Sequence, residues 1–116
     1  RDARYRDEVV NVMDYLLGRN PLDRSYVTGY GERPSENPHH RFWADSLDPA
    51  LPAPPPGVLA GGANNQRPAD PVARRIHAQC LPQTCYVDEI GAYSLNEVAI
   101  NWNAPLFWIA AFLDER

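Results

Sequence analysis

The chain has 116 residues, of which 44 % are apolar, so it can form at most one domain with a real hydrophobic core. Its formal net charge of -4, without any basic stripe, gives no sign of nucleic-acid binding. No apolar run approaches the ~18 residues of a membrane-spanning helix, and no secretory signal is visible.

The first predicted element is a helix over residues 5–17, where apolar side chains recur at helical spacing. Gly18 supplies a helix stop, and Asn20 followed by Pro21 disfavours continuation. Residues 18–46 are rich in Gly, Asn and Pro, which predicts a long loop with a short extended piece at residues 26–28.

Residues 47–72 hold seven of the 12 prolines, a composition typical of a linker. The apolar run at residues 57–60 is nevertheless unusual for a solvated spacer. Further on, Asp70 suits the cap and Pro71 the first position of a short helix over residues 70–77.

The last predicted element is a helix over residues 94–113, with Pro105 either kinking it or marking a late start. A helix that is apolar nearly all round belongs inside a larger body. Its apolar positions are Leu95, Val98, Ala99, Ile100, Trp102, Leu106, Phe107, Trp108, Ile109, Ala110, Phe112 and Leu113.

Two main helices leave about 75 residues of loop, which a compact domain rarely carries unless the loops are functional. The pattern predicts an all-α piece of a larger fold.

The two cysteines, Cys80 and Cys85, leave two alternatives open: a short disulfide in an oxidising compartment, or two free thiols. A zinc site that combines them with His39, His40 and His77 does not have the spacing of common structural zinc sites.

Glu97 has two interpretations. Together with Ser94 it matches the capping box Ser-x-x-Glu, in which the glutamate accepts a hydrogen bond from the N–H of the cap residue. Alternatively, Glu97 is a general acid at a helix N-terminus in a partly apolar cleft. Asp88 lies nine residues earlier and is, by itself, typical of a solvated turn or cap.

Aromatic and basic side chains around these acids offer contacts for a sugar. Tyr86, Tyr93 and Trp102 present ring faces that either stack on sugar rings or pack in a core. His39 and Arg41 lie on a predicted loop. They either belong to an exposed polar loop, or bind an anion or hydrogen-bond sugar hydroxyls.

Two long segments together resemble the signatures of glycoside hydrolase family 9, the inverting cellulases. Residues 25–41, which end Pro38-His39-His40-Arg41, resemble the family's histidine-containing signature. Residues 86–104 resemble its second signature, with an Asp and a Glu nine residues apart. Residues 56–64 resemble the proline- and glycine-rich loop between the signatures, and residues 16–21 the segment that leads into the first one.

This resemblance implies that residues 1–116 are the C-terminal portion of a single glycoside hydrolase catalytic domain, with the N-terminal part absent. The family fold is an (α/α)6 barrel, several times longer than this chain. The chain would then be an all-α fragment of that barrel, with two main helices and long loops that line the active-site cleft.

The implied activity is hydrolysis of β-1,4-glucosidic bonds in cellulose or related β-glucans with inversion of configuration, as in an endo-β-1,4-glucanase. By position, Glu97 resembles the general acid, and Asp88 and His39 are the other catalytic signature residues, with Asp88 positioning its neighbours. His39 and Arg41 would hold the sugar next to the scissile bond, and Tyr93 would contact substrate. Asp45 resembles a position that binds calcium in some members, which predicts a structural calcium ion and no cofactor for catalysis.

Inverting hydrolysis also needs a second carboxylate as general base, and the Asp-rich segment that supplies it in the family has no match here. We therefore expect the chain alone to be inactive and to have two partners: the remainder of the catalytic domain and a β-glucan. A non-catalytic glucan-binding or interaction fragment is the alternative. The resemblance also predicts secretion. The charge and the lack of a long apolar run predict neither nucleic acid nor a membrane as partner.

Overall fold

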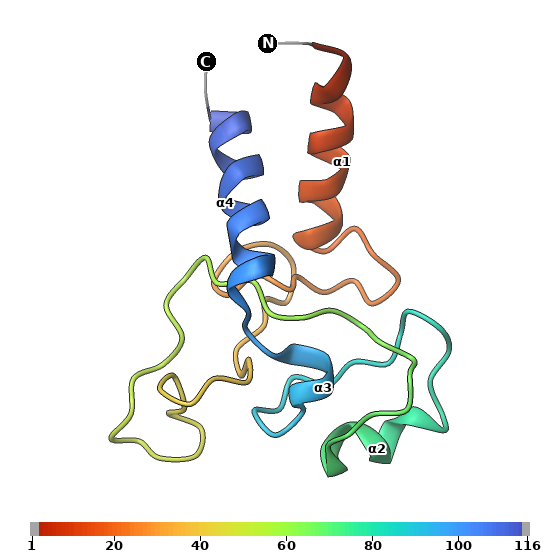
Figure 1. Ribbon diagram of the computed structural model, residues 1–116, viewed down its shortest axis with the longest axis vertical. Helices are drawn as coiled ribbons and strands as arrows, with labels where there is room; N and C mark the ends of the chain where they lie inside the picture. Colours follow the sequence, from red (N-terminus) through yellow and green to blue (C-terminus); the bar gives the residue numbers. More distant parts are fainter. Residues whose placement is uncertain (1–2, 115–116) are drawn as a thin grey trace.

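The computed structural model describes residues 3–114. Their helices are the short 3-10 helix η1 (Ala3–Tyr5), α1 (Arg6–Leu16), α2 (Pro71–His77), α3 (Tyr93–Asn96) and α4 (Ile100–Asp114). The two long helices α1 and α4 contact each other along one half of the molecule, and the loops with α2 and α3 form the other half (Figure 1). The described residues contain no β-strand, only three isolated bridges, so the all-α prediction is confirmed.

The first helix agrees with its prediction apart from its ends. Gly18 follows α1 with a φ of +131°, a conformation that residues with a side chain rarely adopt. A Cβ atom there would lie 2.9 Å from the Cβ of Glu32. Gly18 therefore ends the helix as predicted, and it also lets the following loop pass close to the helix end.

The apolar run at residues 57–60 is paired backbone, so the linker interpretation is wrong for this part of the chain. The N–H of Ala60 donates to the carbonyl of Tyr26 (2.9 Å), and the N–H of Thr28 donates to the carbonyl of Val58 (2.9 Å). These bonds confirm the predicted extended piece at residues 26–28. They also explain why the run is apolar, because its side chains are buried.

The predicted helix over residues 94–113 is in fact two helices, α3 and α4, separated by extended backbone. Glu97 lies at the end of α3 with φ −61° and ψ 144°. Its carbonyl accepts from Gly61 N (2.9 Å), and the N–H of Val98 donates to the carbonyl of His39 (3.2 Å). Since these backbone groups bond to other segments, a continuous helix cannot form. Pro105 lies inside α4 rather than at its start.

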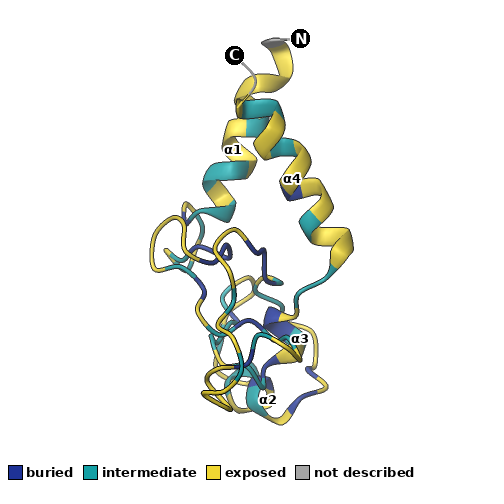
Figure 2. Cartoon of the chain, turned by 90° about the vertical axis from the view of Figure 1, so that its left-hand side faces the viewer, coloured by how far each residue is buried: buried dark blue, intermediate teal, exposed yellow. Residues whose placement is uncertain are grey.

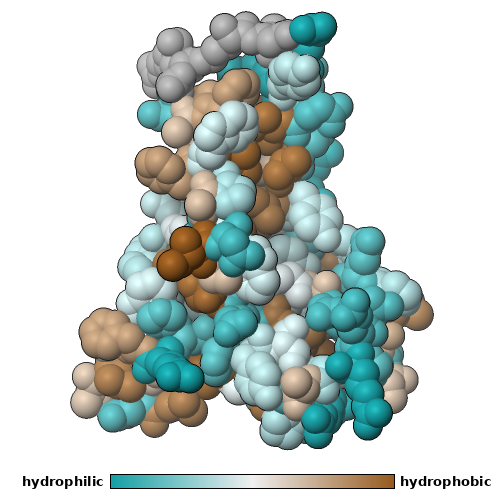
Figure 3. Space-filling view, in the orientation of Figure 1, coloured by the Kyte–Doolittle hydropathy of each residue, from teal (hydrophilic) through white to brown (hydrophobic). Residues whose placement is uncertain are grey.

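Burial is concentrated in the loop half, and the long helices stay mostly exposed (Figure 2). The larger core cluster consists of Tyr26, Val27, Leu59 and Leu106. No residue of α1 is buried, and Leu106 is the buried residue of α4. Apolar side chains therefore gather on the surface of both helices (Figure 3), and Ile100 and Phe107 are 88 % and 77 % exposed. Such a surface agrees with the prediction of a piece of a larger fold.

The loop after α2 contains a disulfide between Cys80 and Cys85, whose Cα atoms are 5.1 Å apart. Of the two alternatives for the cysteines, the structure has the disulfide and not the free thiols. Neither sulfur atom is therefore available for the zinc site considered above. None of the helices among residues 3–114 combines the length and the hydropathy of a membrane span.

Asp70 joins α2 to α3. It caps α2 as predicted, accepting from Ala73 N (2.6 Å), and its second oxygen accepts from Ser94 N (2.9 Å). Burial opposes ionisation of Asp70, but these hydrogen bonds outweigh it and hold the pKa of the carboxyl below its ordinary value. The carboxylate therefore stabilises the fold above the unfolded-state pKa of about 3.9, and this stabilisation is lost as the pH falls through the lower folded-state pKa.

We expect Asp70→Asn to destabilise the intact protein by about 1–3 kcal/mol at pH 7, because an amide leaves one of the two N–H donors without an acceptor. Urea unfolding at pH 7 and pH 3 measures the effect, which should shrink at the lower pH. The matched control is Asp48→Asn, an exposed aspartate that accepts from Ala50 N (2.9 Å), with a change within about 0.5 kcal/mol. An equal loss at both pH values would contradict the role of the charge.

Candidate active site

Glu97 lies in a pocket together with the predicted sugar-binding residues. The pocket has a volume of about 250 Å³ and is lined by His39, His40, Arg41, Glu97 and Val98. Glu97 and Arg41 are exposed, and the two histidines are half-buried. The fold thus brings together side chains that lie more than fifty positions apart in the sequence.

The backbone around Glu97 is held from both sides. On one side, His39 N donates to the carbonyl of Asn96 (3.0 Å), and the His39 carbonyl accepts from Val98 N (3.2 Å). On the other side, Gly61 N donates to the carbonyl of Glu97 (2.9 Å). This arrangement fixes where the carboxyl side chain of Glu97 leaves the backbone.

The capping-box interpretation of Glu97 is wrong. Ser94 lies inside α3, and its N–H donates to the carboxylate of Asp70 instead of to Glu97. Glu97 stands after the end of that helix, so its carboxyl group is not committed to a cap.

The two neighbouring histidines present opposite tautomers when neutral. His39 Nδ1 lies 2.7 Å from the carbonyl oxygen of Ile90. Since a carbonyl only accepts, Nδ1 carries the proton and Nε2 keeps a lone pair. His40 Nδ1 instead accepts from Phe42 N (3.3 Å) and Trp43 N (3.2 Å), so its proton sits on Nε2. One ring therefore offers an acceptor and the other a donor.

Aromatic rings flank both histidines. The Tyr93 ring lies 5.5 Å from the His39 ring, centroid to centroid, and is exposed. The His40 ring stacks on Trp43 at 4.1 Å. Tyr93 is thus placed beside the pocket, where the sequence predicted a substrate contact.

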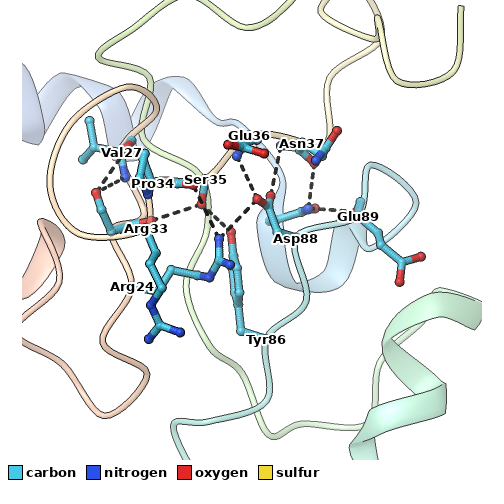
Figure 4. A network of polar contacts seen from close by, with 12 residues as sticks. Arg24, Val27, Arg33, Pro34, Ser35, Glu36, Asn37, Tyr86, Asp88 and Glu89 are labelled. Carbon is cyan, nitrogen blue, oxygen red and sulfur yellow. Dashed lines mark hydrogen bonds and ion pairs between the residues drawn. The ribbon is translucent and has the colours of Figure 1, made fainter.

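Asp88 lies outside the lining of this pocket and holds two loops together. Oδ2 accepts from Glu36 N (2.8 Å) and pairs with Arg24 Nη1 (3.2 Å), and Oδ1 accepts from Asn37 N (3.0 Å), as Figure 4 shows. Its side chain is only 12 % exposed. The solvated-turn interpretation is therefore wrong, and the contacts are those of a residue that positions its neighbours.

Tyr86 packs against the core and does not line the Glu97 pocket. Its hydroxyl group shares a hydrogen bond with Ser35 Oγ (2.7 Å), and its ring packs edge-on against Tyr26 at 5.3 Å. Burial raises the pKa of Tyr86 to about 12, because the phenolate would be poorly solvated. Trp102 lines a different, largely apolar pocket of about 540 Å³ beside α4.

The resemblance predicts a structural calcium ion at Asp45. Asp45 is exposed, and residues 3–114 contain no group of three or more His, Cys, Asp or Glu side chains placed to hold a metal ion. Calcium at Asp45 stays a prediction, and no step below depends on it.

Two residues that bond to the segments around the Glu97 pocket, Arg24 and Asn96, were not identified from the sequence. Arg24 lies 64 positions from its partner Asp88, and no local pattern marks such a pairing. Asn96 is fully buried. Its only signal in the sequence is its place directly before Glu97.

The chain is similar to known proteins in both sequence and fold. The family model described as "Glycosyl hydrolase family 9" matches residues 1–110. The chain is 48 % identical to a cellulose 1,4-beta-cellobiosidase from Acetivibrio thermocellus over 114 residues, which cover 98 % of this chain and 13 % of the relative.

Two solved structures show the same likeness. One is AaCel9A in complex with cellobiose-like isofagomine (TM-score 0.70, 45 % identity, 86 % of this chain and 18 % of the other). The second is a single-mutant thermostable endoglucanase from Alicyclobacillus acidocaldarius (TM-score 0.78, 40 % identity, 97 % of this chain and 21 % of the other).

The chain therefore belongs to glycosyl hydrolase family 9. Its helices correspond to part of the (α/α)6 barrel of the endoglucanases that it resembles. It spans about an eighth of the length of the cellobiosidase and about a fifth of the solved structures.

We expect Asp88→Asn to loosen the loop before His39. The backbone N–H groups of Glu36 and Asn37 each donate to one oxygen of Asp88, and in the variant one of those oxygens is replaced by an NH2 group that cannot accept. Hydrogen exchange at the amides of Glu36 and Asn37 measures this and should accelerate at least about tenfold.

The control for this variant is Glu89→Gln. Glu89 pairs with Arg75 on the surface, both side chains being more than half exposed, so the free energy of unfolding should change by less than about 1 kcal/mol. Unchanged hydrogen exchange at the amides of Glu36 and Asn37 in Asp88→Asn would refute the role of Asp88 in holding this loop.

Proposed function

We propose that this chain supplies the general acid and part of the sugar-binding surface of a β-1,4-glucan hydrolase. The observation that carries this proposal is the exposed carboxyl group of Glu97 in one pocket with His39, His40 and Arg41. The relatives, a cellulose 1,4-beta-cellobiosidase and an endoglucanase, support cellulose or a related β-glucan as substrate. The endoglucanase supports endo-type cleavage.

In the proposed reaction a water molecule attacks the anomeric carbon while Glu97 protonates the departing glycosidic oxygen. The configuration inverts, because attack and departure take place on opposite faces of the sugar. His39 and Arg41 hold the hydroxyl groups of the sugar next to the scissile bond, and the exposed ring of Tyr93 contacts the substrate. Asp88 keeps the loop before His39 in place. No organic cofactor enters this reaction.

The general base of the reaction must come from another part of the catalytic domain. Inverting glycosidases hold the two carboxyl groups roughly 6.5–9.5 Å apart, which leaves room for the water molecule. Glu97 is the one carboxylate among the described residues that line the pocket. We propose that the remaining barrel helices carry the base and pack against the apolar faces of α1 and α4.

Secretion is proposed on separate grounds. The disulfide between Cys80 and Cys85 supports folding in an oxidising compartment. Recovery of the protein from cells but not from the medium would count against secretion.

We expect Glu97→Gln in the complete catalytic domain to lower kcat on unactivated cello-oligosaccharides by about a thousandfold or more, because the amide cannot donate the proton. The loss should be much smaller on a 2,4-dinitrophenyl cellobioside, whose leaving group needs no protonation. Steady-state kinetics on both substrates measures the difference. Binding of cello-oligosaccharides without turnover in the unmodified domain would favour the alternative, a non-catalytic glucan-binding fragment.

The isolated chain is expected to show no turnover on soluble β-glucan, since it lacks the base. Reducing-sugar release by residues 1–116, with and without the remaining part of the domain, tests this. Turnover by the chain alone at the rate of a full-length enzyme would refute the need for a second part.

A further inference from the structure

Asn96 is the fully buried residue directly before Glu97, and its side chain joins two loops. Nδ2 donates to the carbonyl oxygen of Asn37 (3.0 Å) and to that of Glu89 (2.9 Å). Asn37 lies two positions before His39 on the sugar-binding loop. One amide group therefore connects that loop, the loop of the second signature and the backbone that leads into the acid.

The orientation of this amide follows from its neighbours. Both contacts of Nδ2 are carbonyl oxygens, which can only accept, so the nitrogen and the oxygen of the Asn96 side chain cannot be exchanged. Oδ1 is buried and has no hydrogen-bond partner among the described residues.

The backbone of Asn96 adds a third connection. Its carbonyl accepts from His39 N (3.0 Å), so the same residue binds the sugar-binding loop through both its main chain and its side chain. The next residue, Glu97, is extended and bonded to Gly61 on its other flank. A shift of Asn96 would therefore shift the Cα atom of Glu97 relative to His39.

We propose that Asn96 is a positioning residue that holds the carboxyl group of Glu97 at the glycosidic oxygen of a sugar bound by His39. This rests on the proposed function of Glu97 as general acid. Displacing a reacting group by about 1 Å costs roughly a hundredfold in rate, so the loss of both donated bonds should impair protonation of the leaving group more than any other step.

The test compares two substrates in the complete catalytic domain. Departure of alkoxide from cellotetraose requires protonation, whereas departure of 2,4-dinitrophenolate from its β-cellobioside does not. The ratio of the two kcat values does not depend on the folded fraction of a variant. We expect Asn96→Ala to lower this ratio at least about tenfold, and Asn96→Ser, which keeps one donor, to lower it less. If Asn96→Ala does not fold, Asn96→Ser alone must still lower the ratio.

Asn103→Ala is the matched control. Asn103 on α4 also donates two side-chain bonds to carbonyl oxygens, those of Leu59 (3.0 Å) and Ala99 (3.0 Å), and it accepts from Leu59 N (2.8 Å). It does not line the Glu97 pocket. Its loss should lower stability and leave the kcat ratio unchanged.

The outcomes separate this proposal from the one it rests on. An unchanged ratio in the Asn96 variants together with a lowered ratio in Glu97→Gln overturns the role of Asn96 alone. An unchanged ratio in Glu97→Gln overturns the proposed function and this inference with it. An equal fall in the Asn96 and Asn103 variants shows a general structural effect and overturns the inference.

Discussion

The candidate site depends on a short piece of extended backbone at residues 97 and 98. Hydrogen bonds to His39 on one side and to Gly61 on the other hold it. These bonds use backbone groups that would otherwise form the hydrogen bonds of a helix. The helix α3 therefore ends at Asn96, and α4 begins only at Ile100. The interruption frees the carboxyl group of Glu97 from helix capping and places Glu97 beside the loop that carries His39 and Arg41.

Side-chain hydrogen bonds give the long loops their shape. Buried backbone N–H and C=O groups need partners, and where regular structure is missing a few side chains supply them. The carboxylate of Asp88 accepts two backbone N–H groups, and Arg24 balances its charge. Bonds to an ionised group are stronger than neutral ones, so such clamps hold loops that have little apolar area of their own.

The long helices have apolar side chains that the described residues leave exposed. α4 is apolar, yet the described residues bury Leu106 and leave Ile100 and Phe107 exposed. Removing apolar surface from water contributes about 25 cal/mol per Å². The exposed faces of α1 and α4 are therefore suited to packing against the other barrel helices proposed above. The pocket around Glu97 would be completed at the same time as the barrel core.

The sequence by itself determined the elements that depend on local chemistry, namely α1 with its stop at Gly18 and α2 with its cap at Asp70. The pairing of a His-x-Arg loop with a downstream acid was implied only by the resemblance to the two family signatures. It could not show that Glu97 stands outside a helix, that residues 57–60 are paired backbone, that Arg24 pairs with Asp88, or that Asn96 bonds to the loop before His39. Those features rest on hydrogen bonds between segments far apart in the chain. Helix periodicity and capping patterns report only on neighbours within a turn or two, so tertiary structure alone decided where the acid lies.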